Sequence, residues 1–414
     1  MEYSNSAATV VAVRFADQPF YPWLRLITSL LLGTIGSCGM YVVAVALPEI
    51  QAEFGTARTG ASLPYMFTMI GFAGGSIAMG MLTDRFRVLT ALLVGAAVLG
   101  VGYVAAAQAH TILEFAVASM IVGFGCSASF GPLIADISLW FVRRRGIAVA
   151  IVACGNYASG ALWPPFVQHL IVTGGWRAAY VFVGLFSLGS TVALALLLRP
   201  APPQGIVAAL GTASRPSVIS PPFGMSGNTV QALLCLSGVS CCVAMAMPQV
   251  HIVALCADLG YGSTRGAEML SVMLSFGIVS RLLFGWISDH IGGVRTLLLG
   301  ASLQAAALGL FLPNQSLDVL FVVSALFGLF QGGIIPSYAM IVREYFPPEQ
   351  AGTRVALTLM ATLLGMALGG WASGAIFDLT SSYDAAFVHG IAWNLVTIAI
   401  ASMLVWGQRR RAAV

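Results

Sequence analysis

Long apolar runs separated by short polar stretches dominate the chain. The runs recur twelve times, and a helix that crosses a bilayer needs roughly 20 mostly apolar residues. Small residues within the runs follow a helical period, whereas strands of a membrane barrel would alternate over about ten residues. The pattern therefore predicts an all-α membrane protein with twelve transmembrane helices. The predicted spans cover residues 24–48, 61–82, 88–108, 112–136, 147–171, 177–198, 230–256, 266–287, 294–313, 317–340, 355–377 and 385–407.

An internal duplication divides these spans into two sets of six. The segment Gly80–Arg87 after the second run resembles Gly285–Gly292 after the eighth, at an offset of 205 residues. The segments Ala52–Gly55 and Ala257–Gly260 match at the same offset, which is close to half of the chain. We expect an N-terminal six-helix half over residues 1–198 and a C-terminal half over residues 230–414. Residues 199–229 between them are rich in proline, glycine and serine, as in a linker.

The positive charges predict how the helices are oriented. All 19 basic residues are arginines, and 15 of them fall at alternate ends of the spans that would share one side of the membrane. Arg58, Arg177 and Arg265 fall on the other side. Because basic residues are retained in cytoplasmic loops, both termini and the linker should be cytoplasmic. We expect a multi-pass protein of the cell (inner or plasma) membrane, whose first apolar run is a retained helix and not a signal peptide.

Composition argues against several classes of protein. Hydrophobic residues make up 58% of the chain and charged residues only 8%. The seven cysteines lie in or near spans without metal-ligand spacing, so we predict no metal site and treat them as small buried residues. Paired carboxylates and nucleophile motifs are missing at membrane depth. We therefore predict no enzyme, no catalytic residue and no cofactor, no nucleic-acid partner, and a monomer in the lipid bilayer.

One arginine stands apart from the topological pattern. Arg281 lies inside the eighth apolar run, where a guanidinium costs a few kcal/mol at least. Its repeat counterpart is Ser76, so a structural role shared by both halves does not explain it. Gly277 and Gly285 lie one turn to either side and should leave open space, and no acidic residue of a neighbouring predicted span is placed to neutralise the charge. Snorkelling to the headgroups is the alternative, but the planar fork is suited to binding a carboxylate.

Other polar residues at membrane depth are further candidates for a binding site. His251 follows Pro248 in the seventh span and could line the cavity or titrate, although a hydrogen-bonded packing role is equally compatible with the sequence. Five other polar side chains could shape the substrate site. They are Tyr41, Asn156, Tyr157, Gln331 and Tyr338.

Acidic residues recur at the ends of the second and eighth spans. Asp84 and Asp289 occupy repeat-equivalent positions, each near a basic residue, Arg85 and Arg295. An aspartate there can accept hydrogen bonds from a neighbouring helix N-terminus and pair with arginine. We expect these four residues to form a gate that closes the cytoplasmic side in one conformation. Ordinary topological charge is the alternative.

These motifs resemble those of a known group, the major facilitator superfamily. Its loop signature is present with Gly80, Asp84 and Arg85, although Arg87 replaces its second glycine, and recurs with Gly285, Asp289, Gly292 and Arg295. The run Trp140–Ala148, the run Gly174–Arg177 and Arg281 resemble the monocarboxylate and oxalate/formate transporter branch. The resemblance implies the major facilitator fold, with transport by alternating access and Arg281 contacting the substrate.

Two departures from that branch affect the expected substrate. Oxalate/formate antiporters carry a lysine in the eleventh helix, whereas residues 358–374 contain no basic residue. A single cation suits a monoanion better than a dianion. Many animal monocarboxylate carriers have an aspartate one turn before the arginine, but Gly277 takes that place here. The proton route assumed for those carriers therefore does not transfer to this chain.

The combined prediction is a secondary active transporter of a small organic monocarboxylate, coupled to a proton, with Arg281 binding the carboxylate. An anion antiporter or an exporter of aromatic or amphipathic compounds is the alternative within transport. A polytopic membrane receptor is the alternative outside transport, but no loop is long enough for a soluble output domain.

Overall fold

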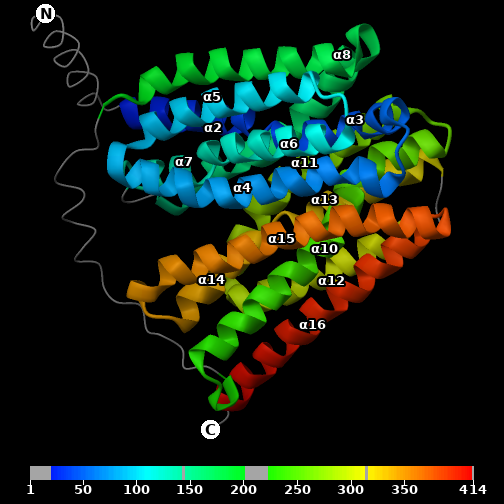
Figure 1. Ribbon diagram of the computed structural model, residues 1–414. Coiled ribbons are helices and arrows are strands. Elements are labelled where there is room, and N and C mark those ends of the chain that lie inside the picture. The colour runs from blue at the N-terminus through cyan, green and yellow to red at the C-terminus, as the bar shows by residue number, and fades with distance from the viewer. Residues whose placement is uncertain (1–19, 142–144, 201–221, 313–315, 413–414) are drawn as a thin grey trace, which may run out of the picture.

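The computed structural model describes residues 20–141, 145–200, 222–312 and 316–412. Within them the secondary structure is entirely helical, and Figure 1 shows long helices arranged in two groups. Most of the predicted linker, residues 201–221, lies outside the described residues. The helices on either side of it end at Leu198 and begin at Gly227, with a short 3-10 turn, Pro222–Gly224, in between.

Helices of the first half follow the predicted runs closely. Their bounds are α2 Tyr21–Gly36, α3 Gly39–Phe54, α4 Arg58–Phe86, α5 Val88–Ala107, α6 Ile112–Cys126, the 3-10 turn Ser127–Ser129, α7 Gly131–Ile137, α8 Arg145–Ala195 and the 3-10 turn Leu196–Leu198. The bounds in the second half are α10 Gly227–Asp258, α11 Ser263–Ile291, α12 Gly293–Phe311, α13 Leu317–Gln331, α14 Ile334–Tyr345, α15 Pro348–Thr380 and α16 Asp384–Ala412.

The number of membrane crossings depends on how α8 is counted. Eleven continuous helical segments among the described residues are long and apolar enough to span a bilayer. One of them covers 53 residues, Gly146–Leu198, which would reach about 80 Å if straight. It bends at Gly175, where φ is 79° and ψ is 160°, a conformation that glycine adopts without a Cβ clash. The segment therefore crosses twice, which gives the twelve predicted crossings.

Helix bounds repeat between the halves. Helices α4 and α11 begin at residues 58 and 263 and end at residues 86 and 291, an offset of 205 at both ends. Helices α6 and α13 cover residues 112–126 and 317–331, with the same offset. Both are interrupted where they end, so the fourth and tenth crossings are each built from two helices. Interrupted helices in membrane transporters occur where the backbone lines a cavity.

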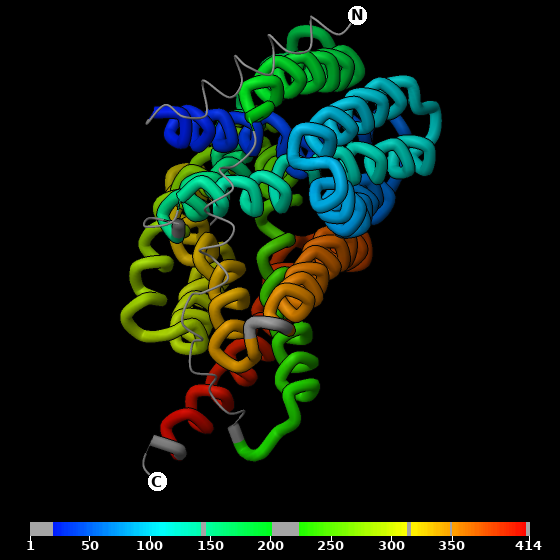
Figure 2. The backbone as a smooth tube through the Cα atoms, turned by 90° about the vertical axis from the view of Figure 1, so that its left-hand side faces the viewer, coloured from blue at the N-terminus to red at the C-terminus, as the bar shows by residue number. Residues whose placement is uncertain are grey.

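Among the described residues the two halves lie side by side, with most of their contacts along three helix pairs and a smaller contact between α3 and α11. Helix α8 packs against α11, α4 against α15, and α3 against α10. Figure 2 shows the first half in the upper part of the view and the second half below it. We call the end that carries Arg85, Arg295 and Arg343 the arginine-rich end; it faces the viewer in Figure 2. The opposite end, where Arg58 begins α4, is the Arg58 end.

Candidate functional site

Arg281 lies at the contact between the two halves. Its side chain projects from α11 toward α8, and its residue is only 7% exposed. The Nη1 atom donates a hydrogen bond of 2.5 Å to the carbonyl oxygen of Ala153. The guanidinium carbon lies 4.4 Å from the ring centroid of Tyr157, within the range of a cation–π contact. Arg281 therefore bridges the halves and does not snorkel.

One donor of this guanidinium, the buried Nε atom, has no hydrogen-bond partner among the described residues. The Nη1 atom donates to Ala153, and Tyr157 also lies within hydrogen-bond reach of the guanidinium. The Nε and Nη2 atoms together present two parallel N–H donors, the geometry that binds both oxygens of a carboxylate. An unsatisfied buried charged donor is costly, so this edge is suited to a ligand.

Three other predicted residues lie around Arg281. Tyr157 stacks on it, and the neighbouring Asn156 accepts a hydrogen bond of 2.5 Å from the hydroxyl of Tyr41. The structure therefore brings Tyr41, Asn156 and Tyr157 together with Arg281 where α3, α8 and α11 meet. The expected open space beside Gly277 is wrong, because a Cβ at that position would lie 2.5 Å from the Tyr157 ring. Gly285 does face open space.

Gln331 lies at the break between α13 and α14. Its Oε1 atom accepts a hydrogen bond of 3.1 Å from Gln249, and its Nε2 atom is buried without a partner among the described residues. A Cβ on the next residue, Gly332, would meet the Gly277 carbonyl at 2.4 Å. The break thus packs against α11 one turn before Arg281. The part of Gln331 in substrate binding stays a prediction.

His251 lies nearer to the Arg58 end and is fully buried. Its Nε2 atom lies 2.8 Å from the carbonyl oxygen of Gly370, which can only accept, so Nε2 carries the proton. Its Nδ1 atom lies 3.4 Å from the hydroxyl of Tyr383. Burial raises the pKa of Tyr383, so this hydroxyl stays protonated and donates to Nδ1. Both nitrogens are satisfied in the neutral ring, and the role of His251 in substrate binding stays a prediction.

Tyr338 forms its hydrogen bonds with residues of α10 and has no described contact with Arg281. Its hydroxyl lies 2.9 Å from the Ser237 hydroxyl and 3.3 Å from the Cys241 sulfur. The side chain is completely buried between α10 and α14. It therefore packs these two helices together, and its part in the site also stays a prediction.

The four predicted gating residues lie at the arginine-rich end and are exposed. Asp84 and Arg85 end α4, whereas Asp289 and Arg295 flank the turn between α11 and α12. None of the four forms an ion pair with another described residue. The expected capping of a helix N-terminus is instead made by Glu344, which accepts a hydrogen bond of 2.8 Å from the Gly293 amide.

The glycine missing from the first loop signature has a conformational role in the second. Gly292 has φ 83° and ψ 162°, and Arg87 at the equivalent position has φ 76° and ψ 164°. This region is almost restricted to glycine, and another residue held there costs about 1–3 kcal/mol. The signature thus selects a backbone shape, which Arg87 adopts at a cost.

A cavity of about 1120 Å³ opens at the arginine-rich end. Asp84, Arg87 and Arg199 line it from the first half, and Arg343 of α14 lines it from the second. Arg281 is not among the lining residues. The volume is ample for a small organic molecule, so the cavity is a candidate vestibule and not the site itself.

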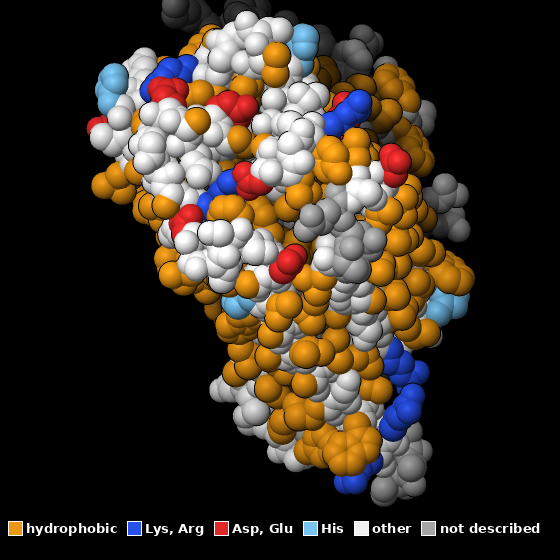
Figure 3. Space-filling view, turned by 90° about the vertical axis from the view of Figure 1, so that its right-hand side faces the viewer, with side chains coloured by type: hydrophobic (Ala, Val, Ile, Leu, Met, Phe, Trp, Pro, Cys, Tyr) orange, Lys and Arg blue, Asp and Glu red, His pale blue; other side chains and the backbone are white. Residues whose placement is uncertain are grey.

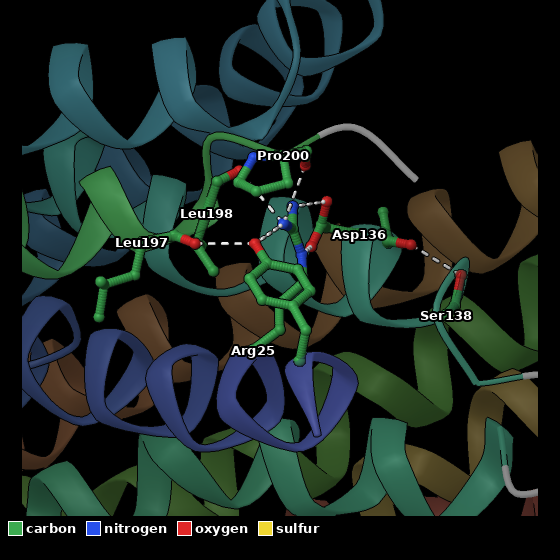
Figure 4. A network of polar contacts seen from close by, with 8 residues as sticks. Arg25, Asp136, Ser138, Leu197, Leu198 and Pro200 are labelled. Atoms are coloured by element: carbon green, nitrogen blue, oxygen red, sulfur yellow. Dashed lines mark hydrogen bonds and ion pairs between the residues drawn. The ribbon is translucent and has the colours of Figure 1, made fainter. Parts of the chain in front are cut away.

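A buried ion pair forms one wall of this cavity. The Nε and Nη2 atoms of Arg25 each donate to Asp136 at 2.7 Å, as Figure 4 shows. The Nη1 atom bonds to the Tyr21 hydroxyl and to the carbonyl oxygens of Leu198 and Pro200. Arg25 is 1% exposed. The carboxylate of Asp136 therefore ties α7 to α2, and Arg25 extends the network to the end of the sixth crossing.

At the Arg58 end, polar contacts connect the halves directly. The guanidinium of Arg58 donates to both carboxylate oxygens of Asp258, at 3.0 and 2.8 Å. The first amides of α4, those of Arg58 and Thr59, donate to the carboxylate of Asp378 at 2.9 and 2.7 Å. Arg58 also stacks on Phe377, at 4.8 Å. Figure 3 views this end, where acidic and basic side chains gather in the upper part of the face.

This closure was not predicted from the sequence. Asp258, at the exposed end of α10, pairs with Arg58 across the interface. The available signal was that Arg58, Asp258 and Asp378 all fall at the same predicted end of their spans. Nothing in the chain indicates which of them pair. The structure is therefore closed at the Arg58 end and hollow at the arginine-rich end.

Comparisons with known proteins agree with this architecture. The model of the Major Facilitator Superfamily matches residues 29–313 and 232–413. Monocarboxylate transporter 13 of Rattus norvegicus is 28% identical over 366 residues, covering 87% of this chain and 82% of that protein. Monocarboxylate transporter 11 of Homo sapiens is 26% identical over 380 residues, covering 87% of this chain and 77% of that protein.

A solved structure shares the fold. It is a bacterial homologue of the human lysosomal transporter Spinster in an inward-facing and occupied conformation, with a TM-score of 0.71 at 15% identity. The match covers 95% of this chain and 98% of that chain. Because the family model also covers both repeats, the chain belongs to the Major Facilitator Superfamily, a family of membrane transporters and not of enzymes, and is a distant relative of the monocarboxylate transporters.

Proposed function

We propose that this secondary transporter carries a small organic monocarboxylate together with a proton, and that Arg281 binds the carboxylate. The observation that carries the proposal is the buried Nε atom of Arg281, which has no partner among the described residues at the contact between the halves. The names of the two relatives compared above support the same substrate class.

The site accounts for one negative charge. Arg281 contributes one cation at membrane depth, and Tyr157 covers one face of its guanidinium. A monocarboxylate on the Nε and Nη2 edge leaves the site close to neutral, whereas a second carboxylate would be buried without a partner. Tyr41 and Asn156 are polar groups beside this edge, and we propose that they contact the remainder of the substrate.

The two ends of the molecule face opposite sides of the membrane and open in turn. The arginine-rich end is cytoplasmic by the distribution of basic residues, so the structure corresponds to a state open to the cytoplasm. In the alternate state, Asp84, Arg85, Asp289 and Arg295 close that end while the contacts of Arg58 separate.

Uptake by purified protein in liposomes tests the proposal. Arg281→Ala should lower uptake of labelled lactate by about 30-fold or more, because removing one partner of a buried charge pair costs about 2–5 kcal/mol. Arg281→Lys should restore only a small part of the wild-type uptake, since an ammonium lacks the planar two-donor geometry of a guanidinium. Arg265→Gln is the matched control, because Arg265 is exposed and pairs only with Glu268 on its own helix. Wild-type uptake by Arg281→Ala would refute the assignment.

A further inference from the structure

Glu49 is an acidic residue inside the first crossing. The predicted span ended at residue 48, but α3 continues through Pro48 to Phe54. Glu49 lies on the same face of α3 as Tyr41, eight residues earlier, a separation of about 12 Å. Glu49 is therefore an acidic residue of the first crossing that lies just beyond the span predicted for it, and it forms no described ion pair with Arg281. Glu49 lies between the Arg281 site and the Arg58 end.

Two buried oxygen atoms near Glu49 have no hydrogen-bond partner. They are Oε2 of Glu49 and Oε1 of Gln168, and neither bonds to any described residue. Gln168 projects from α8, is 3% exposed, and places its side chain beside the Glu49 carboxylate. Both unpaired atoms are acceptors when the carboxylate is ionised. A proton on Glu49 would supply the missing donor and could satisfy both oxygens with one hydrogen bond.

No arginine or histidine of the part of the chain that the structure describes forms an ion pair with Glu49. Helix α3 packs against α4, α6, α8, α10 and α11, whose charged groups at this end are bound elsewhere. Arg177 pairs with Glu53, which itself lies one turn after Glu49, and Arg58 pairs with Asp258. On the same neighbouring helices, Glu114 accepts a hydrogen bond from the His110 amide, and Arg281 donates to Ala153.

An ionised carboxylate in this position would carry a buried charge without a cationic partner among the described residues, with the Gln168 side chain as its neighbour. Such a charge is strongly unfavourable, whereas a protonated carboxyl group that donates to an amide oxygen is not. The contacts around Glu49 therefore fit the neutral form. In this respect Glu49 differs from Glu53, whose carboxylate bonds to Trp176 and Arg177.

We propose that Glu49 is the binding site for the transported proton. This inference rests on the proposed function, because it assigns the residue that couples the proton to monocarboxylate transport. The proton is taken from water when the Arg58 end is open, forms an O–H bond on the Glu49 carboxylate, and donates to Gln168 in the closed state. It returns to water with the substrate on the other side. No other bond is made or broken.

Two transport measurements in liposomes separate coupling from substrate movement. The first is accumulation of labelled lactate driven by a pH gradient, with proton entry followed by a trapped pH-sensitive dye. The second is exchange of labelled for unlabelled lactate at equal pH. Glu49→Gln should lose at least 90% of gradient-driven accumulation and of the dye signal. It should keep exchange within about twofold of wild type, because a neutral side chain imitates the protonated carboxyl group.

A second variant tests the assignment if Glu49→Gln loses both gradient-driven accumulation and exchange. Gln168→Met removes the side chain that bonds to the Glu49 carboxyl group, so the pH of half-maximal uptake should shift by about one unit, a tenfold change in proton affinity. Glu53→Gln is the matched control on the same helix and should keep gradient-driven accumulation within about twofold.

The outcomes distinguish this inference from the proposed function. Wild-type protein that moves neither lactate nor protons would refute the proposed function. Wild-type coupling that persists in Glu49→Gln would overturn the assignment of Glu49 alone. If Glu49→Gln is inactive in both assays, an unchanged pH profile in Gln168→Met overturns the assignment and a shifted profile supports it.

Discussion

The closure at the Arg58 end should set the balance between the two transport conformations. Arg58 is 6% exposed in its pair with Asp258, which is 38% exposed. An exposed pair contributes about 0–1 kcal/mol, and breaking a buried pair costs about 3–5 kcal/mol. Because Asp258 is partly exposed, water compensates for part of the lost interaction. We therefore expect Asp258→Asn to weaken the closure by about 1 kcal/mol, nearer to the value for an exposed pair.

Asp378 adds a second contribution to the same closure. Its carboxylate accepts from two α4 amides and from the Thr59 hydroxyl, and hydrogen bonds to charged groups contribute about 1.5–3 kcal/mol. Asp378→Asn keeps one acceptor oxygen, so we expect a loss of about 1–2 kcal/mol. The double variant should lose about 2–3 kcal/mol, which corresponds to a roughly 30- to 150-fold shift toward the state open at the Arg58 end. Because both carboxylates bind Arg58, deviations from additivity of 0.5 kcal/mol or more are expected.

A reporter cysteine measures this shift. Ser62 is fully buried in α4, where its hydroxyl oxygen lies 2.7 Å from the position of a Cβ built on Gly374 of α15. Ser62→Cys should react with a membrane-impermeant maleimide only when these helices separate. Its labelling rate should rise with the population shift in the double variant until labelling saturates. Protein without Ser62→Cys gives the background from the native cysteines.

An ion pair inside a single helix serves as the control. Glu268→Gln removes an ion pair at the same end, but that pair lies within α11, so labelling should change by less than about twofold. An unchanged labelling rate in the double variant would show that apolar packing, and not these carboxylates, holds the Arg58 end closed.

Four further changes have expected outcomes. Asp84→Asn should shift reporter labelling in the opposite direction, toward the state closed at the Arg58 end, and unchanged labelling would leave Asp84 as topological charge only. Asp136→Ala leaves Arg25 buried without its partner and should cost about 3–5 kcal/mol, so an unchanged thermal unfolding midpoint would refute the role of that pair. Arg87→Gly should raise stability by about 1 kcal/mol or more by removing the backbone strain, whereas the same substitution at Arg85 inside α4 should lower it. Lactate should compete for uptake far better than oxalate at a pH where oxalate is a dianion, and equal inhibition would reveal a second cationic contact beside Arg281.

Apolar runs were sufficient to predict the fold because each crossing must bury its own backbone polar groups in a helix. The offset of 205 residues then predicted the equivalence of α4 and α11, which share their bounds after that offset. The breaks after Cys126 and Gln331 were not predicted. They occur inside continuous apolar sequence, where hydropathy does not distinguish one helix from two.

The candidate site was predictable only in part. Arg281 was visible from sequence because an arginine in an apolar run is rare and costly. Its stacking on Tyr157 and its bond to Ala153 depend on how α8 meets α11. Glu49 was not predicted as a site residue because it lies at the edge of the first apolar run. Its depth in the membrane depends on where α3 ends, which hydropathy does not determine.

Repeat symmetry helps to separate function from architecture in a duplicated chain. Features that both halves share serve the fold, as the matched helix bounds do. Arg281 corresponds to Ser76, which bonds to the backbone of its own helix, and Glu49 corresponds to Ala254, which is fully buried. Arg281 in the second half and Glu49 in the first half thus each have an uncharged counterpart in the other half. The two residues carry charges of opposite sign.

Asymmetry alone does not identify a site, as the Arg25–Asp136 pair shows. This pair is also missing from the second half, where residues 230 and 341 are apolar. All three guanidinium nitrogens of Arg25 have protein partners, so the pair is complete without a ligand. Arg281 keeps an unpaired donor and Glu49 an unpaired acceptor. We propose that the unpaired donor of Arg281 and the unpaired acceptor of Glu49 are the positions where an anion and a proton bind, because an unsatisfied polar atom is costly at this depth.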